Sequence, residues 1–176
     1  MIKIALLVIT AGVGTVLAYA ATKPDSYTVS RSQVINAPAE QLYAIINAPR
    51  EFERWSPYQA RDPQLKNTYS GPASGVGARV EFAGNKHVDE GTVEIVGSTA
   101  PSEVKMRLTM VRPFSARNDV TYSLKPDAGG TEVTWAMHAK APYLVKVMSV
   151  FMDMDKMIGG DFADGLARLK ALAEKG

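Results

Sequence analysis

Four stretches between residues 76 and 138 alternate apolar and polar side chains with a period of two, and this pattern constrains the fold most. Alternation of this kind buries one face of a strand and leaves the other in water, which is typical of an antiparallel sheet. Turn signals such as Gly71-Pro72 and Asp127–Gly130 separate the stretches. The apolar positions are Val76, Ala78, Val80 and Phe82; Val104, Met106, Leu108 and Met110; Val120, Tyr122 and Leu124; and Val133, Trp135 and Met137.

Two further segments complete the predicted sheet, and the remaining periodicity is helical. Residues 27–35 are rich in β-branched side chains, and a further strand is expected around 90–96. Short helices are predicted over 39–47 and 50–55, because Pro38 suits a first helical turn and Pro49 ends the first of them.

The C-terminal region predicts one long helix. Apolar residues recur every three to four positions from Tyr143 to Leu169, so the helix should run to about Glu174. Gly159-Gly160 interrupts this pattern, and Asp161 could cap a second segment, so a kink or a tight approach to the sheet is expected there. The resulting fold class is α+β, with a curved antiparallel sheet, two short helices and one long helix across its inner face.

The N-terminus begins with an apolar segment, residues 4–21, which only Thr10 and Thr15 interrupt. As a helix it would be about 27 Å long, just short of a hydrocarbon core of about 30 Å. Three interpretations remain open: a membrane anchor, a cleaved signal peptide with Ala18-Tyr19-Ala20 as its cleavage site, or a buried helix of the domain. We expect residues 1–22 to be anchor or signal, 23–26 a linker, and 27–175 the folded domain.

Location follows from the first two interpretations. Both carry the rest of the chain across a membrane, and the single positive charge of Lys3 before the apolar run agrees with this orientation. The domain is therefore expected on the periplasmic or extracellular side, either anchored through residues 4–21 or exported after cleavage.

Composition excludes several classes of function. Twenty basic residues against 18 acidic ones give a net charge of +2 without a run of Lys or Arg, so no nucleic-acid partner is expected. The chain contains no cysteine, which removes disulfides, thiolate nucleophiles and Cys-ligated metal sites. We expect no cofactor.

No set of residues in the sequence resembles a catalytic or metal site. His87 is expected in an exposed turn, and the strand parity of His138 directs it outward. Phosphate-loop, HExxH and GxSxG motifs are absent, and residues 71–77 are interpreted as a hairpin loop. The carboxylates at 153, 155, 161 and 164 diverge on a helix, so they are interpreted as a solvated face rather than a calcium site.

The inward face of the predicted sheet is more informative. It is apolar, includes flexible Met and large aromatic side chains, and meets Val147, Phe151, Met154 and Ile158 of the long helix. A filled core and a ligand cavity both fit this pattern. In the second case the ligand-binding residues would be Phe82, Met106, Leu108, Met110, Asn118, Val120, Tyr122, Trp135, Met137, Phe151 and Met154.

Several local motifs in this order resemble the helix-grip (SRPBCC) superfamily of START domains and Bet v 1-like proteins, in particular its polyketide cyclase/dehydrase-like group. They are Val34–Pro38 with Glu40, Trp55–Tyr58, Gly71–Gly77, Gly129–Trp135, and Asp161-Phe162 with Gly165-Leu166. The resemblance spans about residues 27–173. It implies a helix-grip fold that binds hydrophobic small molecules or lipids between sheet and helix, with only some members acting as enzymes.

Three functions follow as hypotheses. The leading one is a binding module, anchored or exported, that holds a hydrophobic small molecule or lipid. The second is a polyketide cyclase/dehydrase-type enzyme acting on an apolar substrate, in which Arg31, Asn118 and Tyr122 would hold an enolate or polarise a carbonyl. The third is a protein-interaction domain that uses the outer face of the sheet, where Arg79, Glu81, Lys105, Arg107 and Lys125 mix the two charges.

Overall fold

A computed structural model describes residues 2–86, 88–112 and 115–175, with residues 2 and 4–8 described as backbone only. The strands are β1 (Ser26–Ile35), β2 (Lys66–Ser70), β3 (Arg79–Ala83), β4 (Glu90–Thr99), β5 (Glu103–Arg112), β6 (Ala116–Asp127) and β7 (Gly130–Lys140). The helices are α1 (Ile2–Ala21), α2 (Ala39–Ile46), α3 (Pro49–Phe52), α4 (Pro57–Arg61), α5 (Tyr143–Phe151) and α6 (Met154–Ala173).

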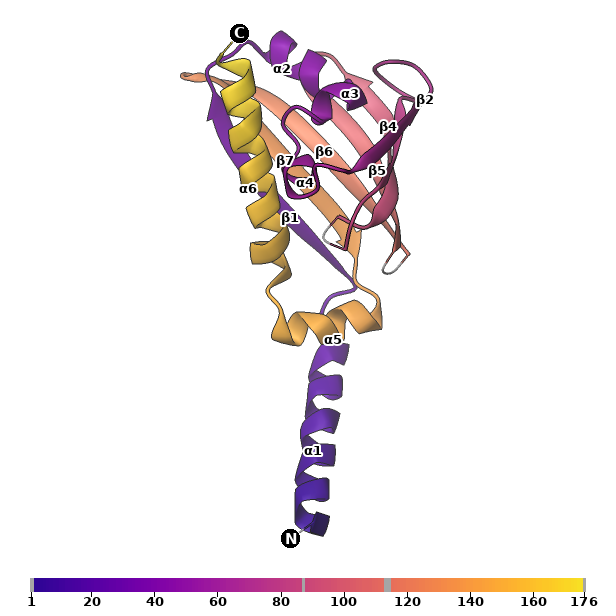
Figure 1. The fold of residues 1–176 in the computed structure, drawn as a ribbon. Coiled ribbons are helices and arrows are strands. Elements are labelled where there is room, and N and C mark those ends of the chain that lie inside the picture. The colour runs from indigo at the N-terminus through magenta and orange to yellow at the C-terminus, as the bar shows by residue number, and fades with distance from the viewer. Residues whose placement is uncertain (1, 87, 113–114, 176) are drawn as a thin grey trace.

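The strands form one antiparallel sheet in the order β1-β7-β6-β5-β4-β3-β2. Its curved inner face is covered by α6 and by the short helices α2 to α4 (Figure 1). The α+β helix-grip architecture predicted from the sequence is therefore confirmed. The β1–β7 register runs from Ser26–Lys140 to Ile35–Thr131, so the start of β1 and the end of β7 lie at one end of the sheet.

The strands predicted from the period-two alternation are present, but some of their ends differ from the prediction. Strand β3 begins at Arg79, so Val76, predicted to face inward, lies in the preceding loop and is exposed. The hairpin loop predicted at residues 71–77 is present: it connects β2 to β3, and positive φ angles at Gly71, Gly75 and Gly77 bend it. Strand β2 was not predicted, because its sequence Lys-Asn-Thr-Tyr-Ser contains only one large apolar residue.

The short helices differ from the prediction in number and extent. The segment predicted as 50–55 is helical only over Pro49–Phe52, and a separate helix, α4, follows. The Oγ atom of Ser56 accepts hydrogen bonds from the backbone N–H groups of Tyr58 and Gln59, which caps α4, and Pro57 occupies its first turn.

The predicted long C-terminal helix is present as α6, but it begins at Met154 rather than at Tyr143, and it has no kink at Gly159-Gly160. The chain is extended at Met152 and Asp153, which separates α5 from α6, and both glycines lie inside a continuous α6. Asp153, not Asp161, is the cap: its carboxylate accepts the backbone N–H of Lys156 at 2.9 Å. Helix α5 therefore turns away from the sheet.

The position of α5 sets the shape of one end of the molecule. It lies across the end of the sheet, and α1 projects from it away from the domain (Figure 1). Contact between the two helices includes a hydrogen bond of 2.9 Å from the Tyr143 hydroxyl to the backbone oxygen of Leu17. The predicted contact of Val147 and Phe151 with the inner face of the sheet is consequently wrong, and 74% of Phe151 is exposed.

Candidate functional site

Aromatic rings fill the space between the centre of the sheet and α6. Trp135 of β7 stacks on Phe162 of α6 with ring centroids 4.3 Å apart. Trp55 packs edge-on against Trp135, and the centroids of these two rings are 5.9 Å apart. Tyr122 of β6 and Phe52 close the cluster from either side. These five residues, which we call the aromatic core, join α3, the α3–α4 connection, α6 and the sheet.

Two donors in the aromatic core are unusual. The indole N–H groups of Trp55 and Trp135 are buried and have no hydrogen-bond partner among the described residues, although the two residues are only 1% and 4% exposed. An unpaired buried donor costs about 1–3 kcal/mol, so native proteins rarely leave one without an acceptor.

A cavity lies between the start of β1 and the α5–α6 junction. Its volume is about 620 Å³, within the range of small-molecule sites. Buried Val29 and Ala141 contribute to its wall, and exposed residues such as Phe151 and Asp153 stand at its rim. It is lined by Lys23, Pro24, Ser26, Tyr27, Thr28, Val29, Ala141, Val145, Lys146, Ser149, Val150, Phe151, Met152, Asp153, Met154 and Asp155.

One face of α5 forms a wall of this cavity. Val145, Lys146, Ser149 and Val150 line it, and their spacing of three and four residues places them on one side of the helix. This geometry depends on the break at Met152-Asp153, because a straight helix would carry the same residues along the sheet instead.

Two ammonium groups stand at the linker side of the cavity. The side chain of Lys146 is only 11% exposed, and its Nζ lies 2.5 Å from Oδ1 of Asp25, which is 97% exposed. The hydrogen bond and charge of Lys146 lower the pKa of Asp25. Nζ of Lys23 donates to the backbone oxygen of Ser149 at 2.6 Å, so its charge meets a carbonyl rather than a carboxylate.

The opposite side of the cavity is closed by an ion pair. Arg31 of β1 donates to both carboxylate oxygens of Asp155, at 2.9 and 3.1 Å, and to its backbone oxygen at 3.0 Å. The Arg31 hydrogen bonds lower the pKa of Asp155. Arg31 lies against Gly159 of α6: a Cβ there would lie 2.0 Å from Nη2 of Arg31 and would force the guanidinium to shift.

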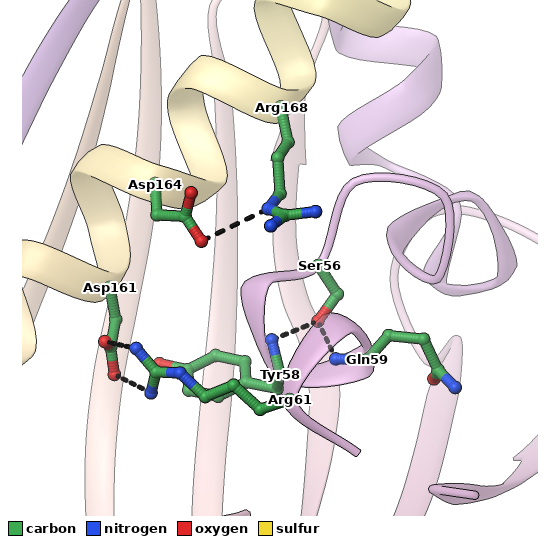
Figure 2. A network of polar contacts seen from close by, with 7 residues as sticks. All are labelled: Ser56, Tyr58, Gln59, Arg61, Asp161, Asp164 and Arg168. Carbon is green, nitrogen blue, oxygen red and sulfur yellow. Dashed lines mark hydrogen bonds and ion pairs between the residues drawn. The ribbon is translucent and has the colours of Figure 1, made fainter. Parts of the chain in front are cut away.

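A second polar network fastens α4 to α6 above the aromatic core (Figure 2). Arg61 forms a two-pronged ion pair with Asp161, which is mostly buried, while Asp164 and Arg168 pair within α6 at 3.1 Å. Tyr58 lies beneath Arg61, and burial raises its pKa far above the usual tyrosine range, with the charge of Asp161 as a second cause. The carboxylates predicted as a merely solvated face thus include one structural partner of α4.

The predicted ligand-binding residues separate into three groups in the structure. Phe151 and Met154 line the 620 Å³ cavity. Val120, Tyr122, Trp135 and Met137 are buried in or beside the aromatic core. Phe82, Met106, Leu108, Met110 and Asn118 are half-buried on the sheet. The part that these residues play in binding stays a prediction.

The sequence interpretation missed the cavity residues of the linker and of α5, in particular Lys23, Lys146 and Ser149. Residues 23–26 were interpreted as a spacer, and the only available signal was their basic and proline content next to an apolar run. Without the break at residue 153, nothing in the spacing could bring this segment against α5.

The three candidate catalytic groups do not converge. Asn118 and Tyr122 are four residues apart on β6, so their Cα atoms are about 13 Å apart. The guanidinium of Arg31 is occupied by Asp155, and Tyr122 is fully buried, which raises the pKa of its hydroxyl well above its usual value. His138 is exposed, as predicted, with Nδ1 3.1 Å from Oγ1 of Thr28, and His87 lies outside the described residues.

No helix is long and apolar enough to cross a bilayer over the residues whose side chains the structure describes. These residues leave out 4–8 of the N-terminal apolar run.

Solved structures with this architecture come from varied sources. A protein from Mesorhizobium loti superposes with a TM-score of 0.62 at 17% identity, covering 85% of this chain and 98% of its own. The structure titled Ara h 8.0201 gives 0.61 at 9% identity, covering 86% and 99%. The di-domain ARO/CYC protein BexL from the BE-7585A biosynthetic pathway gives 0.60 at 11% identity, covering 90% of this chain and 53% of its own. At these identities the likeness shows the fold.

No curated protein matches the whole chain significantly. The profile of the family described as "Polyketide cyclase / dehydrase and lipid transport" matches residues 26–174, from the first residue of β1 to the C-cap of α6. The aromatic core, the α4–α6 network and every cavity-lining residue except Lys23 and Pro24 lie within this range, and so the chain belongs to the polyketide cyclase/dehydrase and lipid transport family.

Proposed function

We propose that this protein binds a hydrophobic small molecule or lipid in the 620 Å³ cavity between β1 and the α5–α6 junction. The cavity carries the proposal, because it is large enough for an amphiphile and its wall includes Val29, Val145 and Val150. Burial of about 300 Å² of apolar ligand surface contributes roughly 7 kcal/mol before ordering costs, which suffices for micromolar binding.

The charges at the cavity select the head group of such a ligand. Lys146 and Lys23 stand at one side, and Asp155 on the other side is already engaged by Arg31. A carboxylate or phosphate monoester would replace the exposed Asp25 as the partner of Lys146 and would reach the Lys23 ammonium. We therefore propose an anionic amphiphile, with its apolar tail directed along Val145 and Val150 toward the aromatic core.

The family description and the fold agree with this proposal. The description includes lipid transport, and the family range contains every cavity-lining residue from Ser26 onward.

The test is a binding titration with 11-(dansylamino)undecanoic acid, a fluorescent fatty acid, on the full chain in phosphatidylcholine nanodiscs. Trp55 and Trp135 are the only tryptophans, so energy transfer from indole to dansyl reports occupancy of this domain. We expect micromolar binding that Ser149→Phe abolishes by filling the cavity. Ser102→Phe, at an exposed turn at the far end of the sheet, should bind like the wild type. Equal binding by both variants would refute the proposed site.

Location is a separate proposal. We propose that residues 4–21 hold the domain at a membrane, on the periplasmic or extracellular side. The end of α1 packs on the domain, because Ala20 is fully buried and Leu17 accepts from Tyr143, which supports retention of the segment. N-terminal sequencing of the mature chain checks this: a chain that begins at Ala21 would show cleavage instead.

A further inference from the structure

Large apolar side chains are exposed where α1, α5 and α6 meet. On α5, Leu144 is 52% exposed and Phe151 is more exposed still, and Met157 at the start of α6 is half-exposed. Ile9 and Val13 of α1 are also exposed, in a helix that projects beyond the domain (Figure 1). Exposed apolar surface of this extent, gathered at one end of a molecule, marks a contact with another protein or with lipid.

The two faces of α5 differ in character and in neighbours. Val145, Lys146, Ser149 and Val150 line the cavity, so this face mixes apolar and polar side chains. Leu144 and Phe151, seven residues apart, lie on the other side of the helix, with Phe151 at the rim of the cavity. No α5 residue is fully buried. The side that carries Leu144 and Phe151 is largely exposed, so it lacks an apolar neighbour among the described residues.

We infer that α5 lies on the surface of a lipid bilayer, with Leu144 and Phe151 in contact with acyl chains, so that the cavity loads directly from the membrane. This inference rests on the proposed ligand-binding function and names its source of ligand. The partner is a lipid surface rather than a second protein, because the adjoining α1 is apolar on all described sides and directs the same end of the domain toward an apolar phase.

Charge at this end of the sheet fits an anionic lipid surface. The register of β1, β7 and β6 places exposed Arg117 and Lys140 at the end that carries α5. Two of the acidic residues there, Asp25 and Asp155, are already paired with Lys146 and Arg31. Basic residues near a membrane contribute about 1 kcal/mol each toward binding anionic lipid.

Because the chain lacks cysteine, single cysteines can map the contact in the full chain reconstituted in phosphatidylcholine/phosphatidylglycerol vesicles. Leu144→Cys and Phe151→Cys, each labelled with an NBD fluorophore, should shift their emission to the blue and be quenched by doxyl-labelled lipid. Ala128→Cys, in the β6–β7 turn at the opposite end of the sheet, should show neither effect. Labels at 144 and 151 that behave like the label at 128 would overturn the inference, and so would labels shielded from both doxyl lipid and an aqueous quencher, since that result indicates a protein partner.

A transfer assay separates this inference from the proposed function. Leu144→Asp, which does not touch the cavity, should slow uptake of dansylundecanoate from vesicles by about tenfold, because a charge replaces a lipid-buried leucine. Its equilibrium affinity for the probe should match that of Ala128→Asp. Unchanged uptake with normal affinity would refute membrane loading alone. Absence of probe binding by the wild type, despite quenched labels, would refute the proposed function instead.

Discussion

The rings of Trp135 and Phe162 stack with centroids 4.3 Å apart and planes inclined by 11°, so that α6 contacts the centre of the sheet through an aromatic stack. Both residues are nearly fully buried. The stack therefore fixes the position of the helix whose N-terminal end borders the ligand cavity.

Removal of one ring from this stack should destabilise the domain strongly. We expect Phe162→Ala to lower the free energy of unfolding by about 3–5 kcal/mol, because it opens a void against Trp135. Phe151→Ala removes the same side chain from an exposed position and should change stability by less than about 0.5 kcal/mol. Urea unfolding of the full chain, followed by tryptophan fluorescence, measures both. Similar losses in the two variants would contradict the assignment of α5 and α6 as separate helices.

Close approach at Gly165 makes a second prediction about α6. A Cβ at this position would lie 2.6 Å from Cζ3 of Trp135 and 3.2 Å from Cδ of Pro57, and Trp135 cannot move away without disturbing its stack on Phe162. We expect Gly165→Ala to cost about 1–3 kcal/mol. Gly160→Ala meets nothing within 4 Å and should stabilise by up to about 1 kcal/mol, because alanine favours the helix. Thermal unfolding of the pair tests this, and a gain in both variants would show that α6 is not seated as described.

The sequence predicted the sheet well because period-two alternation directly records which face of a strand is buried. It could not predict β2, because the short polar sequence of this strand does not alternate between apolar and polar residues. The strand pairs with β3, and the side chains of Asn67 and Tyr69 donate hydrogen bonds to Glu53 at the end of α3. Several residues of the motifs that carried the family resemblance lie close together in the structure. Trp55 and Trp135 belong to the aromatic core, and Gly165 packs against Trp135.

The candidate site was harder to predict, because it depends on one break in a helix. Apolar spacing continues through Phe151 and Met152, so the pattern favoured one long helix, while the break depends on two extended residues and the Asp153 cap. The glycines at 159 and 160 suggested a kink or a tight approach to the sheet. The second alternative holds at Gly159, which lies against Arg31 of β1, but a contact between segments distant in sequence leaves no local periodicity that could identify the partner.

The ion pair between Arg61 and Asp161 should couple α4 to α6. In a double-mutant cycle with Arg61→Ala and Asp161→Ala, we expect a coupling energy of about 1 kcal/mol, because the pair is two-pronged and Asp161 is only 17% exposed. The same cycle for Asp164 and Arg168, an exposed pair four residues apart on α6, should give about 0.3–0.5 kcal/mol. Equal coupling in both cycles would show that α4 gains nothing from the contact.

Acid should weaken the closure of the cavity through Asp155. The pKa of Asp155 is lowered below its ordinary value of 3.8 by the Arg31 hydrogen bonds, so the carboxylate binds its proton less readily in the folded than in the unfolded chain. Its contribution to stability is therefore complete above the unfolded pKa and disappears as pH falls through the lower, folded pKa. We expect the melting temperature of wild type to exceed that of Asp155→Asn by a constant small margin from pH 7 to about pH 5, and the margin to shrink below about pH 4. Asp119→Asn, at an exposed carboxylate without an ion pair among the described residues, should melt like wild type throughout. A margin for Asp155→Asn that persists at pH 2.5 would mean that the substitution acts through packing and not through the charge that Arg31 binds.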